Sequence, residues 1–158
     1  MTYTLSLTSV LSTMRALAAM SILSAPDDIR QPLADLIMAD RRDLHLRLAK
    51  DAFAEMLLGL LPYVADSNLD DEESPELLTL EIPCADSLGS AAVTVIRHAL
   101  EQSLAYRVFH LCLLSLPDTP GRLIGEIGGK IDAHQSRALD LLRSVGWNYP
   151  FIRKCEFP

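Results

Sequence analysis

The chain has 158 residues, a formal net charge of −7, and 49% hydrophobic against 22% charged residues. Binding to a phosphate backbone depends on clustered Lys and Arg that release counterions, so the acidic balance, with a pI near 5.0, excludes direct nucleic-acid binding as the expected function. A chain of this length is expected to fold as one domain. Its high apolar content has two explanations, an apolar helical core or a surface that contacts another chain.

The first apolar stretch, LSLTSVLSTMRALAAMSILSAP, is expected to be part of the folded protein. It has no basic segment before it, and Arg15 interrupts it, unlike a secretory signal. No apolar run reaches the ~20 residues of a membrane span, so we expect a soluble protein. Cys84, Cys112 and Cys155 are widely spaced without a CxxC pair, which predicts a reducing compartment and neither a disulfide framework nor a zinc site.

Four segments have the apolar spacing of amphipathic helices. The first covers residues 8–23. The second starts at Asp40, whose carboxylate can cap the helix, has Asp43 in its first turn, and ends at Pro62. Its predicted buried rows are Leu44, Leu48, Ala52, Met56 and Leu60, and beside them Ala49, Phe53, Leu57 and Leu61.

The third helix pattern covers residues 87–116 and has the widest apolar face, with Val93, Val95 and Leu114 among its widening residues, which predicts a central position. The fourth helix is expected to start with Thr119 as the cap and Pro120 in the first turn, and to end at Gly146.

Two short segments alternate apolar and polar residues as strands do. These are TYTLSL at residues 2–7 and LLTLEI at residues 77–82, and they could pair as a two-stranded element packed on the helices. The segment APDDIRQP, with two prolines and two acids, is expected to be a loop or a single helical turn. The predicted fold is therefore mainly α, with a four-helix bundle-like domain at residues 1–146 and an extended aromatic tail at residues 147–158.

Several polar residues have the spacing of catalytic or metal-binding groups, and the alternative for each is a solvent-exposed position. His98 and Glu101 form an HxxE pair, and Asp51 and Glu55 are spaced i, i+4, which is a ligand pattern of bundled metal proteins. At ~100° per residue, however, His98 points away from the apolar face of its helix, so no metal site is predicted. The glycines of GRLIGEIGGKI lack the order of a phosphate-binding loop, and no GxSxG context is present. We expect no enzyme activity and no cofactor.

The tail is the predicted partner-binding site. Its rings and cations are of the residue types that dominate binding energy at interfaces, and the candidate residues are Trp147, Tyr149, Phe151, Arg153 and Phe157. Two arrangements are open: the tail can fold back over its own bundle, or it can dock on a neighbouring subunit.

Three stretches carry a family resemblance: LTSVLSTMRALAAM, MADRRDLHLRLAKDAFAEMLLGLLPYV, and LTLEIPCADS followed by IRHALEQSLAYRVFHLCLL. In layout they resemble the opening helix, the capped helix and the strand-to-long-helix of small helical head-tail neck or tail proteins of phages and prophages. The resemblance implies a structural component whose copies assemble into rings and whose termini reach neighbouring subunits.

The expected function is that of a non-catalytic virion-assembly protein that forms a homo-oligomer through apolar helical faces. Its expected partners are further copies and other protein subunits, not nucleic acid or membrane. Its expected location is the bacterial cytoplasm, or the virion if the protein is phage-encoded. The alternative is a bacterial helical adaptor or regulatory protein that binds one protein partner.

Overall fold

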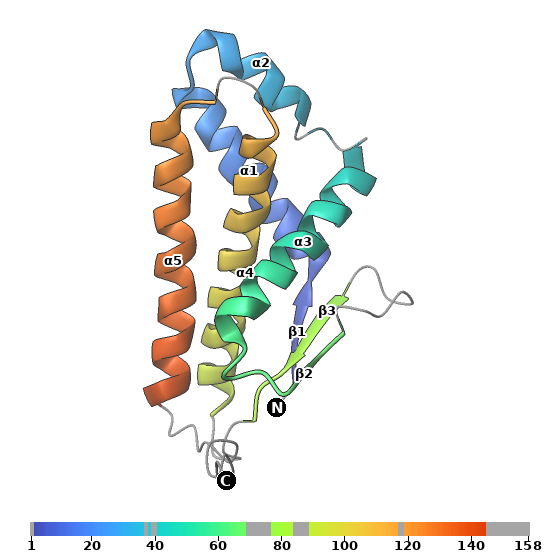
Figure 1. The fold of residues 1–158 in the computed structure, drawn as a ribbon, viewed down its shortest axis with the longest axis vertical. Coiled ribbons are helices and arrows are strands. Elements are labelled where there is room, and N and C mark those ends of the chain that lie inside the picture. Colours follow the sequence, from blue (N-terminus) through green and yellow to red (C-terminus); the bar gives the residue numbers. More distant parts are fainter. Residues whose placement is uncertain are drawn as a thin grey trace, which may run out of the picture.

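The computed structural model describes residues 2–36, 38, 41–68, 77–83, 89–116 and 119–144. The elements in chain order are β1 (Thr2–Ser6), α1 (Leu7–Ser24), α2 (Asp27–Leu36), α3 (Arg42–Leu60), β2 (Asp66–Ser67), β3 (Leu77–Glu81), α4 (Ser90–Leu114) and α5 (Gly121–Ser144). The prediction of a mainly α fold with a small sheet is confirmed (Figure 1).

The small sheet joins the beginning of the chain to its middle. β1 pairs antiparallel with β3, with Thr4 opposite Thr79, so the predicted pairing of the two alternating segments is confirmed. β2 adds a third strand on the other side of β3, which the sequence analysis missed because two residues carry no alternation. Asn68 fixes this edge, since its side-chain amide donates to the Leu77 carbonyl at 3.0 Å and its side-chain oxygen accepts from the Thr79 amide at 2.7 Å.

The prediction that the segment APDDIRQP forms a loop or a single helical turn is wrong in part, because most of its residues belong to helix α2. Ile29 and Leu33, one turn apart, are both buried. Asp27 and Asp28 lie in the first turn, where the helix dipole favours negative charge, and Asp27 pairs with Arg30 at 2.7 Å. These local terms and the burial of one apolar row outweigh the missing amide of Pro32.

The second predicted helix is α3, and its predicted rows are mostly right. Ala49, Ala52, Phe53, Met56, Leu57 and Leu60 are buried, whereas Leu44 and Leu48 are half-buried. Leu61 was assigned to the buried face, but it follows the end of the helix and is exposed. Asp40, the predicted cap, lies outside the described residues, and Arg41 occupies the N-cap position.

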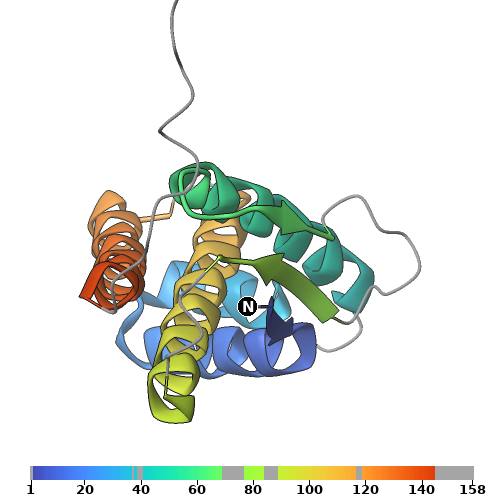
Figure 2. The same ribbon diagram turned by 90° about the horizontal axis from the view of Figure 1, so that it is seen from below.

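Helix α4 is central, as predicted. It packs against α1, α3, α5 and β1, and in the end-on view it lies between α5 on one side and the sheet and α3 on the other (Figure 2). Its buried residues include Ile96, Leu100, Leu104 and Val108. Two residues expected to widen the buried face, Val95 and Leu114, are exposed instead, because no element of the described fold covers those positions.

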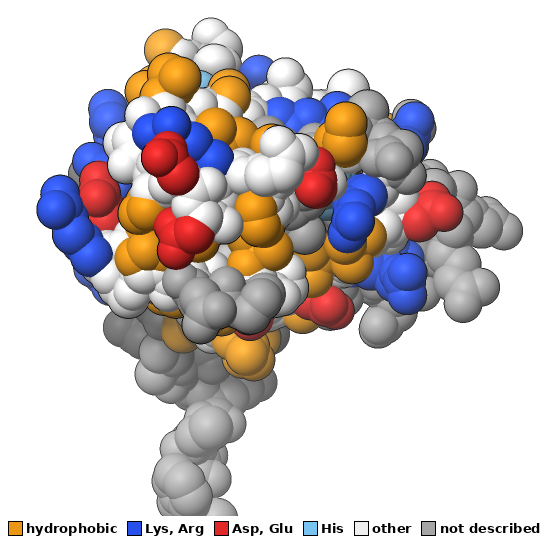
Figure 3. Space-filling view, turned by 90° about the horizontal axis from the view of Figure 1, so that it is seen from above, with side chains coloured by type: hydrophobic (Ala, Val, Ile, Leu, Met, Phe, Trp, Pro, Cys, Tyr) orange, Lys and Arg blue, Asp and Glu red, His pale blue; other side chains and the backbone are white. Residues whose placement is uncertain are grey.

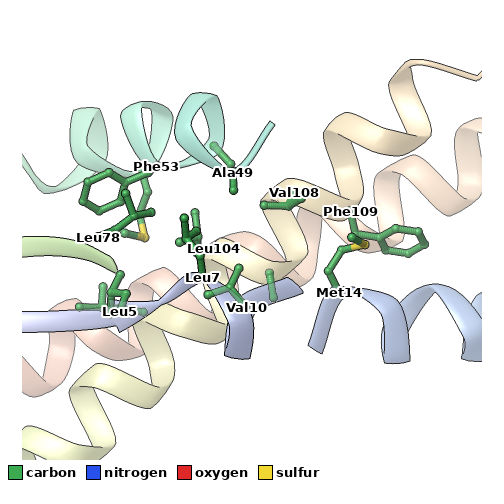
Figure 4. Close-up of a cluster of buried hydrophobic side chains, with 14 of the residues drawn as sticks. Leu5, Leu7, Val10, Met14, Ala49, Phe53, Leu78, Leu104, Val108 and Phe109 are labelled. Atoms are coloured by element: carbon green, nitrogen blue, oxygen red, sulfur yellow. The ribbon is translucent and has the colours of Figure 1, made fainter. Parts of the chain in front are cut away.

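The core forms where α1, α3, α4 and the β1–β3 pair meet (Figure 4). Leu5 and Leu78 extend from the sheet toward Leu7 and Phe53 in the close-up, while farther along Met14 of α1 lies against Phe109 of α4. Of these six residues, Leu78 has 2% of its surface exposed and the other five have at most 1%. At about 25 cal/mol per Å² of buried apolar surface, such residues supply most of the driving force for folding.

The start of α5 differs from the prediction in its capping. Thr119 was expected to cap α5, but its hydroxyl donates to the carbonyl oxygens of Leu113 at 2.9 Å and Leu116 at 3.3 Å. It therefore bonds to carbonyl groups in the last turn of α4 and just beyond it, where a helix has no amides four residues on to supply all of its carbonyls. The first bonds of α5 run from the amides of Leu123 and Ile124 to the Pro120 carbonyl.

Candidate functional site

The predicted partner-binding residues of the tail, Trp147, Tyr149, Phe151, Arg153 and Phe157, lie outside the described residues, so their role stays a prediction. The helix that leads to them, α5, ends beside the end of α3, where Arg143 donates to the Tyr63 hydroxyl at 3.0 Å. Leu58 and Leu61, at this same end of the molecule, are 69% and 62% exposed. A tail that folds back would therefore find an apolar surface there.

The acidic residues with metal-ligand spacing have other partners in the structure. Glu101 accepts a hydrogen bond from the Ser6 amide at 3.5 Å, and Glu55 pairs with Arg107 at 3.6 Å. His98 lies on the exposed side of α4, as its helical angle predicts. Within the described ranges, no group of three or more His, Cys, Asp or Glu side chains converges to hold a metal ion.

The most unusual surface is the outer side of α1. Only five of the helix's 18 residues are buried, and they point inward around Met14. At ~100° per residue, the opposite side presents a line of exposed residues with alternating spacings of three and four. We call this line the α1 outer seam: Ser9, Ser12, Ala16, Ala19 and Leu23.

The α1 outer seam contains small and apolar residues and no charge. Leu23 is 82% exposed, and Met20, which flanks the seam, is 70% exposed. The only charged residue of α1, Arg15, lies at the side of the helix, where it lines a small pocket of about 110 Å³ with Arg42 of α3. Alternating spacings of three and four are those of helices that pack along each other, and small residues allow a close approach.

The apolar surface continues at the upper end of the molecule. α1 and α4 both end there, and Leu114 in the last turn of α4 is 55% exposed (Figure 1). Seen from above, this end shows hydrophobic side chains between separate charged ones (Figure 3). Exposed apolar patches of this kind are typical of surfaces that contact another protein.

The composition of α1 also satisfies a simple test for a membrane-crossing helix. Over Leu7–Ser24 the mean hydropathy is 1.3, a value shared by membrane spans, signal sequences and core helices of soluble proteins. In this fold α1 packs on α4, α2 and β1 and buries Val10, Leu11 and Met14, so its inner side is part of the core. Only its outer side is open to a further partner.

Comparison of the chain with protein-family models, with curated proteins and with solved structures gives no match. The functional conclusion therefore depends on the residues and geometry of the chain itself. The hydrophobic pattern of the sequence predicts association through apolar helical faces but does not locate them. The seam could have been found by noting that α1 has one charge in 18 residues, too few for a helix with a solvated side.

Proposed function

We propose that the protein is a non-catalytic assembly protein that associates with further copies of itself through the α1 outer seam. The observation that carries this proposal is the uncharged outer side of α1, with its three-and-four spacing and the exposed Leu23. Most symmetric dimers bury the same patch on both subunits, so the patch has to be complementary to itself. An uncharged, small-residue helix face meets that requirement.

The seam is the side of the protein where charge opposes the binding of a second copy least. Each chain has a net charge of −7, so two copies repel each other over most of their surface. Contact through α1 brings no like charges together, because the seam has none and Arg15 lies to its side. A partner attracted by charge would instead be expected to bind elsewhere on the molecule.

Size sets the expected affinity. The 18 residues of α1 span about 27 Å at 1.5 Å per residue, and one helix side is small beside the ~800 Å² per subunit of a standard interface. Leu114 and Met20 extend the contact at the upper end. We therefore expect a reversible oligomer with a dissociation constant in the micromolar range. Contacts added by further subunits would strengthen the association.

The test measures oligomeric state with and without a charge in the seam. Light scattering after size exclusion, from about 1 μM to about 1 mM protein, is expected to show an oligomer that dissociates on dilution. Ala16→Glu places one carboxylate per chain in the seam and is expected to weaken association at least tenfold, since like charges would meet in a desolvated contact. Ala91→Glu adds the same charge at an exposed site on α4 and is expected to leave association unchanged.

Three results would overturn the proposal. The first is a wild-type protein that stays monomeric throughout the concentration range, which would favour the adaptor alternative with a different protein as partner. The second is equal association of the Ala16→Glu and Ala91→Glu variants. The third is wild-type protein that floats with neutral phosphatidylcholine vesicles while Ala16→Glu does not, which would assign the seam to a membrane.

A virion position for this assembly is supported by the resemblance to phage neck and tail proteins. In that setting the tail residues, Trp147 to Phe157, would connect neighbouring subunits. Removal of residues 147–158 separates the two contacts: we expect the deletion to keep self-association through α1 and to lose binding to a neighbouring subunit of another type. Lost self-association after the deletion would place the oligomer contact in the tail.

A further inference from the structure

A cleft of about 420 Å³ opens between α4 and α5, on residues that the self-association proposal does not use. Its polar residues include His98 and Gln102 of α4 and His134 and Arg137 of α5, and its apolar residues include Val95 and Ala99. We call this place the basic cleft. It combines three side chains that carry or can carry positive charge with a small apolar wall.

The basic cleft is unusual in a protein with a net charge of −7. Neither a hydrogen bond nor an ion pair to Arg137 occurs within the part of the chain that the structure describes, whereas Arg30, Arg107 and Arg143 there each bond to an acidic or polar side chain. The nearest acidic residue in the sequence, Asp140, pairs with Arg143 at 3.5 Å.

The electrostatics at His134 point the same way. Burial lowers the pKa of His134 below its ordinary value, and the positive charges of Arg137, Lys130 and His98 lower it further. No carboxylate offsets these cations among the causes of the shift. A protonated His134 therefore lacks a counter-charge that would stabilise it, and a bound anion would supply one.

We propose that the basic cleft binds a small organic oxyanion, a carboxylate or a phosphate ester, between α4 and α5. The guanidinium of Arg137 would hold two oxygens in its planar fork, and protonated His98 and His134 would donate to the remaining oxygens. Gln102 offers a further amide donor, and Val95 and Ala99 form the wall for the apolar part of the ligand. This function is separate from self-association through α1.

One contact prepares the cleft for binding. The ring of Tyr106 on α4 stacks on the ring of His134, with 5.3 Å between ring centroids and 20° between ring planes. Stacking holds the imidazole in a fixed orientation, which reduces the entropy cost of using it as a donor. A divalent cation fits this site less well, because the positive charges of Arg137 and Lys130 would repel it.

The experiment follows the imidazole carbon-bound protons of the full-length protein by NMR during titration with phenyl phosphate, benzoate and, as an uncharged control, benzyl alcohol. Both anions are expected to shift the His98 and His134 signals. The anion that binds more tightly indicates whether the ligand is a phosphate ester or a carboxylate. Bound anion stabilises the imidazolium of His134, so the pKa of His134 rises on binding and affinity increases as pH falls through its titration range. Benzoate separates this effect from titration of the ligand, because a carboxylate keeps its charge there.

Two variants make the test specific. Arg137→Gln is expected to weaken anion binding at least tenfold and, without ligand, to raise the pKa of His134 because one of its positive neighbours is gone. Arg122→Gln removes the same charge from an exposed site of α5 that lies 15 residues, or about 22 Å, away and is expected to change neither.

Any one of four results would overturn the proposal. These are no shift of either histidine at millimolar anion, an equal loss of binding in Arg137→Gln and Arg122→Gln, binding of benzyl alcohol as tight as that of the anions, and a single zinc ion that binds at His98 and His134 and excludes the anions. Since Arg137 is exposed, both variants are expected to fold, and a circular dichroism melt checks this.

Discussion

Helices α1 and α5 both pack along α4, but their solvent-facing sides differ in charge. All seven charged residues of α5 are exposed: Arg122, Glu126, Lys130, Asp132, Arg137, Asp140 and Arg143. α1 has a single charged residue, and its outer side presents Ala16, Ala19 and Leu23 to solvent. The outer side of α5 is therefore typical of a solvent-exposed helix, whereas the outer side of α1 is suited to contact with another protein.

The inner sides of the two helices differ as well. The contact of α1 with α4 is apolar, with Met14 against Phe109 (Figure 4). The contact of α5 with α4 includes buried polar groups: Arg107 donates to Gln135, and the Ser103 hydroxyl bonds to the Ile131 carbonyl at 3.5 Å. The α1 side should therefore respond most to lost volume, and the α5 side to lost hydrogen-bond partners.

The largest effect is expected on the apolar side. Phe109→Ala removes a fully buried ring and leaves a cavity beside Met14, so the free energy of unfolding should fall by about 3–5 kcal/mol. Urea unfolding followed by circular dichroism measures this loss. Leu114→Ala, five residues along the same helix but 55% exposed, is the control and should cost less than about 0.5 kcal/mol in the monomer. Equal losses in the two variants would contradict the apolar packing of this side.

At the polar contact between α5 and α4 we expect a smaller loss of unfolding free energy, and the effects of the two partners should not be additive. Gln135→Ala leaves the half-buried guanidinium of Arg107 without this partner and should cost about 1.5–3 kcal/mol, the usual range for a hydrogen bond to a charged group. Glu55 is half exposed and compensates only partly. In a double-mutant cycle with Arg107→Met, the combined loss should be at least about 0.5 kcal/mol smaller than the sum. Additive losses would show that the two side chains do not depend on each other.

The smallest effect is expected where α4 passes into α5. Thr119→Val keeps the shape of the side chain but removes the hydroxyl that donates to Leu113 and Leu116, which should cost about 1 kcal/mol. Thr94→Val is the matched control, because its exposed hydroxyl donates only to the Ser90 carbonyl one turn earlier. If Thr94→Val costs as much as Thr119→Val, the hydroxyl of Thr119 has no special role in ending α4.

The long helices and the paired strands could be read from the sequence, because apolar spacing and alternation reflect which side of an element faces the core. The short helix α2 could not be read in this way. Pro26 before the helix and Pro32 inside it are local signals for a break, but burial of Ile29 and Leu33 under the neighbouring elements outweighs them. The role of Thr119 was missed for a related reason, since the sequence does not say which of two adjacent helices a hydroxyl will cap.

The candidate sites show a similar division. Apolar spacing predicts association through apolar faces, yet it also predicts that Val95, Leu114 and Leu61 are buried, whereas the structure has them exposed. Hydrophobic spacing gives the apolar side of a helix but not the extent to which a neighbour covers it. The basic cleft had no sequence signal, since His98 and His134 are 36 positions apart and meet only because α5 packs along α4.

The sequence by itself determined the helical class, the span of the long helices, the alternation of the two main strands and the acidic balance, because these depend on residues near each other along the chain. Tertiary structure alone decided which apolar residues stay in contact with water and which cations face each other across α4 and α5. Burial and charge proximity are properties of elements that pack together, and no local pattern contains that information.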